Sequence, residues 1–148
     1  MSKSEGFSLI ELLIVVAVIG IIAALAVPNL VQSKKSASEA SALASVRNLV
    51  TAEITYASTP GGGNFGSMAE LSTENFADEV LGSDQKDAYD FSVAANESIG
   101  FSVIATPTVP GTTGERSFYG DETGVIRYTA DGTVPDSTSP PLGGRVSP

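Results

Sequence analysis

Hydrophobic residues dominate one long segment near the N-terminus of the chain. No position from residue 12 to residue 31 is charged, and Gly20, Pro28 and Asn29 interrupt an otherwise apolar or small-residue run. A helix over such a run is ~30 Å long, which matches the hydrocarbon thickness of a bilayer. A helix on the surface of a small soluble domain is apolar on one face only. We therefore expect residues 7–30 to form a transmembrane helix rather than a buried helix of a soluble protein.

After Asn29 the composition shifts to Ala and Ser, while the helical spacing continues. Apolar residues recur at intervals of three or four and so share one face: Leu43, Val46, Val50, Ile54 and Ala57. Glu39 falls among the polar positions away from this face. The pattern predicts one helix from about residue 7 to residue 57, with residues 31–58 as an amphipathic continuation of the membrane segment.

The spacing of apolar residues changes to a period of two in the C-terminal half. The sequence TPGGGN at residues 59–64 ends the helix, and residues 59–88 are expected to form a connecting region with one short helical piece near residues 67–81. Alternation then predicts four strands within a sheet region at residues 89–132: 89–93, 99–106, 116–121 and 125–129. The Pro, Gly and Ser content of residues 133–148 predicts an irregular tail. The expected fold class is α+β, with the long helix packed on an antiparallel sheet of about four strands.

Composition narrows the functional class. The chain has 148 residues, a formal net charge of −9, and neither cysteine nor histidine. An acidic surface disfavours non-specific nucleic-acid binding, so we expect no direct nucleic-acid partner. The usual general bases and nucleophiles are missing, so an enzyme is not expected, and no motif indicates a cofactor. Without disulfides, the part outside the membrane depends on core packing and strand pairing.

Two features distinguish the apolar segment from a plain membrane anchor. Glu11 lies just inside it, and an ionised group at membrane depth is costly unless it has a partner. The residues MSKSEG precede Phe7, so cleavage after Gly6 would give Phe7 a free α-amine four residues before Glu11. An ordinary secretory signal is instead cut after its apolar region. A positive charge supplied by an assembled state would suit Glu11 best.

The segment GFSLIELLIVVAVIGIIAALAVPN, residues 6–29, resembles the N-terminus of type IV pilins and of the related pseudopilins of secretion systems. The residues that carry the resemblance are Gly6, Phe7, Glu11, Gly20, Pro28 and Asn29. The resemblance implies that residues 1–6 are a leader, which a prepilin peptidase and methyltransferase removes by cutting after Gly6 before it N-methylates Phe7. It also implies that Glu11 pairs with the Phe7 amine of a neighbouring subunit during filament assembly.

Gly20 and Pro28 are expected weak points of the helix. Proline removes a backbone donor and kinks helices, and glycine lowers helix stability. The resemblance implies that the segment from Gly20 to Pro28 loses helicity in the filament.

The expected function is that of a structural pilin in a type IV pilus. By the resemblance, the partners are other copies of the chain, an inner-membrane assembly platform and, before assembly, membrane lipid. The precursor would cross the inner membrane once, and the assembled form would lie in an extracellular pilus or a periplasmic pseudopilus. Two alternatives are a pseudopilin of a type II secretion system and a membrane-anchored binding module that never polymerises.

Charged residues in the sheet region have two interpretations. Asp121, Glu122, Asp131 and Asp136 lie near predicted turns, and the major pseudopilins that the chain resembles bind calcium through a C-terminal loop. Acidic residues in turns more often serve turn formation itself, so we expect no metal site. Arg116 and Arg127, on neighbouring predicted strands, are expected to pair with these acidic residues, or else to contact a neighbouring subunit.

Overall fold

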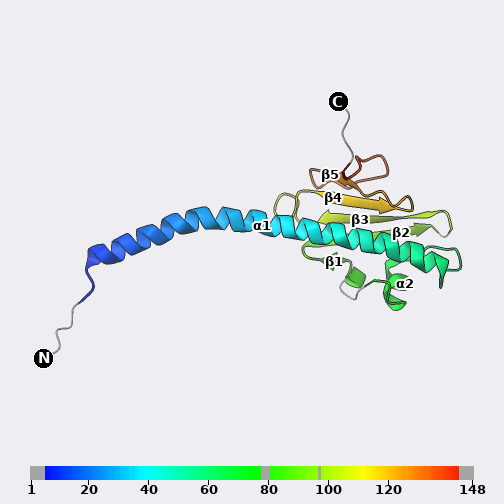
Figure 1. Cartoon of the computed structure of the whole chain (residues 1–148), viewed down its shortest axis with the longest axis horizontal. Helices are drawn as coiled ribbons and strands as arrows, with labels where there is room; N and C mark the ends of the chain where they lie inside the picture. Colours follow the sequence, from blue (N-terminus) through cyan, green and yellow to red (C-terminus); the bar gives the residue numbers. More distant parts are fainter. Residues whose placement is uncertain (1–5, 78–80, 97, 144–148) are drawn as a thin grey trace. The chain divides into compact units, whose positions relative to one another are not determined.

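The computed structural model describes residues 6–77, 81–96 and 98–143 (Figure 1). The chain divides into two compact units, Met1–Lys34 and Lys35–Pro148, and we call the second unit the head. Several predicted features lie outside the described residues: leader residues 1–5, residues 78–80 of the expected helical piece, residue 97 of the expected turn and residues 144–148 of the tail.

A single helix, α1, spans Leu9–Ser58 and confirms the predicted long helix. The residues that follow bond its last carbonyl groups: the N–H of Gly61 donates to the carbonyl of Tyr56, and the N–H of Gly63 donates to that of Ala57, both at 2.8 Å. Gly62 and Gly63 have φ values of 59° and 98°. Glycine adopts this left-handed conformation without strain, which explains why the helix ends at the glycine run.

The C-terminal half forms one five-stranded antiparallel sheet in sequence order. Its strands are β1 (Gln85–Lys86), β2 (Tyr89–Asn96), β3 (Gly100–Pro107), β4 (Ser117–Asp121) and β5 (Arg127–Thr129). The four predicted strands correspond to β2–β5, although β5 begins two residues later than expected. β1 was not predicted, because two residues are too few to show a period.

The region between α1 and the sheet contains α2 (Met68–Thr73) and a short 3-10 helix, η1 (Leu81–Ser83). A capping box begins α2, in which Ser67 and Glu70 each accept from the other's backbone N–H. This arrangement satisfies two donors that a helix start leaves unpaired.

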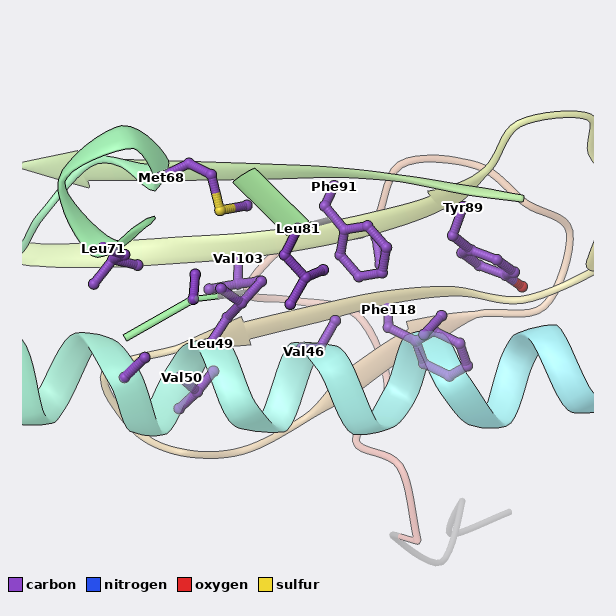
Figure 2. Packing of buried hydrophobic residues seen from close by; sticks show 14 of the residues in the cluster. Val46, Leu49, Val50, Met68, Leu71, Leu81, Tyr89, Phe91, Val103 and Phe118 are labelled. Carbon is purple, nitrogen blue, oxygen red and sulfur yellow. The ribbon is translucent and has the colours of Figure 1, made fainter. Parts of the chain in front are cut away.

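The hydrophobic core of the head lies between α1 and one face of the sheet. Figure 2 shows Val46, Leu49 and Val50 on the side of α1 that meets the strands, opposite Val103 and Phe118. A Cβ atom at position 120 of β4 would lie 2.6 Å from Cγ2 of Val50. Glycine at this position therefore lets the helix pack closely against β4.

The buried face of α1 differs in part from the predicted face. Val46 and Val50 are buried as expected, but Ile54 is 46% exposed. Glu39, expected among the polar positions, is only 7% exposed, and Glu53 is 0% exposed. The face that meets the sheet thus includes two carboxylates, which a pattern of apolar residues cannot reveal.

The C-terminal segment pairs with the outer edge of β5. Pro141 forms an isolated bridge with Arg127, the N–H of Tyr128 donates to the carbonyl of Pro140, and that of Leu142 donates to the carbonyl of Ile126. The described part of the tail is irregular, but these bonds attach it to the sheet and cover an edge that would otherwise be open.

Candidate functional site

The apolar part of α1 is exposed on every side. The large hydrophobic side chains of residues 7–31, which include Phe7 just before the helix, range from 89% exposed at Phe7 to 48% at Val31. Within the described residues, α1 is the one helix long and apolar enough to cross a membrane. A soluble protein would not leave such a surface in water, so this segment requires lipid or other protein chains around it.

Glu11 interacts with the start of its own helix. The backbone N–H of Ser8 donates a 2.9 Å hydrogen bond to Oε2 of Glu11. Ser8 immediately precedes α1 and Glu11 is its third residue, so the sequence Ser-Leu-Ile-Glu forms half of a capping box. The sequence predicts that a positive charge in an assembled state suits Glu11 best, and that prediction does not name this local partner, which the Ser-x-x-Glu spacing indicates.

The two expected weak points do not interrupt α1 in this structure. A Cβ atom at Gly20 would meet no atom within 4 Å, apart from the helix backbone itself and adjacent residues. Pro28 lies inside the helix, and beside it the Asn29 side-chain amide donates to the carbonyl of Leu25 at 3.0 Å. Packing within the protomer therefore does not explain glycine at position 20. The Asn29 amide bonds the carbonyl of Leu25 and not that of Ala24, which is the carbonyl that proline at position 28 leaves without its helical donor.

The acidic residues near the turns act mainly on their own backbone. Asp121, Asp131 and Asp136 share the pattern Asp-x-Thr, and in each case one carboxylate oxygen accepts from both the N–H and the hydroxyl of the threonine. These bonds lower the pKa of Asp131 and Asp136, with the threonine hydroxyl contributing most. Among the described residues, no three Asp, Glu, His or Cys side chains are grouped as a metal site would require. The geometry is that of turn formation.

Glu39 is the centre of a polar cluster that joins α1 to the start of β4. Its Oε1 accepts from the N–H groups of Glu115 at 2.9 Å and Arg116 at 3.3 Å, and its Oε2 accepts from Nε of Arg116 at 2.8 Å. Burial raises the pKa of Glu39, but these bonds and the Arg116 charge outweigh it, so the pKa lies below its ordinary value. Lys35, one turn earlier, pairs with Glu115 at 3.3 Å.

The expected pairing of the two arginines with the acidic turn residues was wrong, whereas their contact with a neighbouring subunit stays a prediction. Arg116 pairs with Glu39 on α1 rather than with an acidic turn residue, and Nη1 of Arg127 donates to the carbonyl of Ser139 in the C-terminal segment. The sequence pattern places Glu39 among the polar positions away from the apolar face of the helix. It therefore does not predict the contact of Glu39 with a residue far along the chain.

Comparison with known proteins identifies the N-terminal segment. The model of the family described as "Prokaryotic N-terminal methylation motif" matches residues 1–27. The chain is 41% identical over 54 residues to the type IV major pilin protein PilA of Myxococcus xanthus, a stretch that covers 36% of this chain and 24% of that protein. It is 51% identical over 39 residues to the type IV wide pilus major component PilA4 of Thermus thermophilus, covering 26% of this chain and 30% of that protein. The aligned stretches thus span less than a third of these relatives.

Proposed function

We infer that this chain, whose N-terminal segment matches the methylation-motif family and is similar to two type IV pilus components, is the structural subunit of a type IV pilus. One observation carries the inference: the residues that match the methylation motif lead into a helix whose apolar N-terminal part, up to Val31, is exposed on every side. Such a helix can be covered by lipid in a precursor and by other copies in a filament. Because every copy offers the same surface, head-to-tail contacts that do not close into a ring would produce a helical polymer.

The processing steps follow from the position of Gly6 and Phe7 at the edge of the apolar segment. We propose that a prepilin peptidase removes residues 1–6 and that the new Phe7 amine is N-methylated. Before assembly, residues 7–30 cross the inner membrane, and an assembly platform in that membrane then transfers the subunit into the filament. The role is structural rather than catalytic.

Glu11 is proposed to exchange one partner for another during assembly. In the separate protomer its carboxylate accepts from the N–H of Ser8, which lowers the cost of placing it near lipid. In the filament the Phe7 amine of a neighbour would supply the opposite charge. Removing one member of such a buried pair costs ~3–5 kcal/mol, so the pair would penalise every register in which it fails to form.

Gly20 and Pro28 are proposed to allow α1 to unwind locally when the helices pack together. Proline lacks the donor for one helical hydrogen bond. At Gly20 no packing contact within the protomer requires the absence of a side chain. The cost of losing helical hydrogen bonds there is therefore lower than elsewhere in the segment.

Substitutions of Glu11 test the proposal. Glu11→Ala should insert into the membrane normally, but the yield of sheared filaments should fall by more than about tenfold, because the neighbour's amine loses its partner. Glu74→Ala, which removes an exposed carboxylate at the end of α2, is the matched control and should assemble normally.

Glu11→Gln separates the two contacts of Glu11. The amide oxygen can still accept from Ser8 but cannot form an ion pair, so this variant should fail to assemble like Glu11→Ala. Normal filament yield from Glu11→Ala would contradict the pairing, and normal yield from Glu11→Gln alone would assign the role of Glu11 to the helix cap instead.

A further inference from the structure

A second buried carboxylate, Glu53, lies on the head-facing side of α1 and has no counter-ion. It is 0% exposed, and its Oε2 accepts a 2.9 Å hydrogen bond from the N–H of Gly66. Its Oε1 has no hydrogen-bond partner among the described residues. Glu39 on the same helix is also buried, but Arg116 compensates its charge. Ionisation of Glu53 therefore costs more free energy than ionisation of Glu39.

Gly66 belongs to the connector, which we define as residues 59–67 between α1 and α2. A Cβ atom at Gly66 would lie 3.0 Å from the ring of Tyr56, so glycine lets the connector backbone approach α1. Aromatic pairs pack in the same region. The ring centroids of Phe65 and Phe101 are 4.8 Å apart, and those of Tyr56 and Phe76 are 6.1 Å apart. The Gly66–Glu53 bond thus joins the connector to α1 at a closely packed point.

The charges near Glu53 oppose its ionisation. Glu70 of α2 acts on it with a negative charge, and the ionisable side chain one turn along α1 is the phenol of Tyr56. Glu74, at the end of α2, adds negative charge around Tyr56. The ion pairs among the described residues do not include Glu53. Strands β2 and β3 contribute apolar residues to this core. Burial, the largest cause, raises the pKa of Glu53, the Gly66 bond lowers it by less, and the Glu70 charge raises it further.

We propose that Glu53 is a pH-sensitive latch, which fastens the connector to α1 while it is protonated and loosens that attachment when it ionises. Ionisation in the closed arrangement leaves a fully buried negative charge that no ion pair among the described residues compensates, whereas movement of Gly66 away from α1 would expose the carboxylate to solvent. The charged form therefore favours an open connector. The latch lies wholly within the head and does not depend on filament formation.

The direction of the pH effect follows from proton binding. The closed state binds the Glu53 proton more tightly than an opened or unfolded state, where the pKa is near its ordinary value of 4.5. The stabilising contribution is fully present below that value and is lost as the pH rises through the higher pKa of the closed state. Within that window the opening equilibrium of the connector should increase by up to about tenfold per pH unit.

Hydrogen–deuterium exchange of the full-length protein in detergent micelles tests the latch. After correction for intrinsic exchange rates, protection of the amides of residues 61–67 should fall as the pH rises above 4.5 in the wild type. Glu53→Gln keeps the shape and the Gly66 acceptor without the charge, so its protection should not show this fall. Glu122→Gln, which removes an exposed carboxylate in the turn after β4, should retain the wild-type profile. Identical pH profiles for the wild type and Glu53→Gln would overturn the proposal.

A second measurement on the wild type keeps the proposal testable if Glu53→Gln does not fold. The side-chain carboxyl carbon of Glu53 can be titrated by NMR in the same micelles. A midpoint above the ordinary value, reached together with faster exchange at Gly66, supports the latch. A midpoint at or below 4.5 overturns it.

Discussion

The Nε atom of Arg116, which immediately precedes β4, donates a 2.8 Å hydrogen bond to Oε2 of Glu39, which lies 77 residues earlier in α1. The other carboxylate oxygen accepts from the backbone N–H groups of Glu115 and Arg116. Tyr89 of β2 donates its hydroxyl to the carbonyl of Arg116 at 2.7 Å. One short segment is therefore bonded to both the helix and the sheet, near the point where the head begins at Lys35.

Glu39→Gln should destabilise the head by about 1.5–3 kcal/mol at neutral pH. The amide cannot form the ion pair, and its NH₂ group would face the guanidinium, although solvent around the partly exposed Arg116 limits the loss. Because the pKa of Glu39 is lowered, its contribution is full above the ordinary value of 4.5 and is lost as the pH falls through the native pKa.

Urea unfolding of the wild type and Glu39→Gln from pH 7 to pH 3 measures this effect. The difference in the free energy of unfolding should narrow below about pH 4.5. Glu74→Gln, which removes an exposed carboxylate, should leave the free energy of unfolding nearly unchanged. If the free energy of unfolding of the wild type exceeds that of Glu39→Gln by the same amount at pH 3 and pH 7, the carboxylate charge is not what stabilises the cluster.

Gly114→Ala should destabilise the head by about 1–3 kcal/mol through overpacking. An added Cβ atom would overlap the hydroxyl of Tyr89, and this fully buried side chain is held by its hydrogen bond to Arg116. Gly20→Ala is the control, because its methyl group meets no atom of the protomer outside the helix itself. Thermal unfolding of both variants measures this difference, and the melting temperature of Gly114→Ala should be the lower one. Equal melting temperatures for the two would contradict the packing around Tyr89.

Calcium should not change the stability of the head. Asp121, Asp131 and Asp136 each bond the threonine two positions later, so their carboxylates serve separate turns. The melting temperature should be the same in excess calcium and in a chelator. A rise in calcium that is abolished by Asp131→Asn would contradict the assignment of these residues to turns and would indicate a metal site.

The long helix and most of the sheet could be predicted because their residue patterns are extensive. α1 combines an uncharged run with a helical repeat, and burial alternates along β3 and along the first half of β2. The local bond between Ser8 and Glu11 was also readable from the Ser-x-x-Glu spacing, although we did not infer it. β1 could not be predicted, because its two residues are defined by pairing with β2 rather than by their own sequence.

The buried carboxylates could not be predicted from periodicity. A pattern of apolar residues treats every glutamate as a solvent-facing position, and so Glu39 and Glu53 seemed unremarkable. Their burial depends on donors supplied by Arg116 and Gly66, which only the folded chain brings to α1. The same reasoning led us to expect Ile54, which is exposed, on the buried face.

The most direct test of the proposed function is the intact mass and N-terminal sequence of the chain recovered from filaments sheared off intact cells. The account predicts a chain that begins at N-methylated Phe7 and has the mass of residues 7–148 plus one methyl group. Processed chain that is found only in the cell envelope would instead favour a pseudopilin. A chain that still begins at Met1 or Ser2 and is absent from sheared material would contradict the proposal that this protein is a pilus subunit.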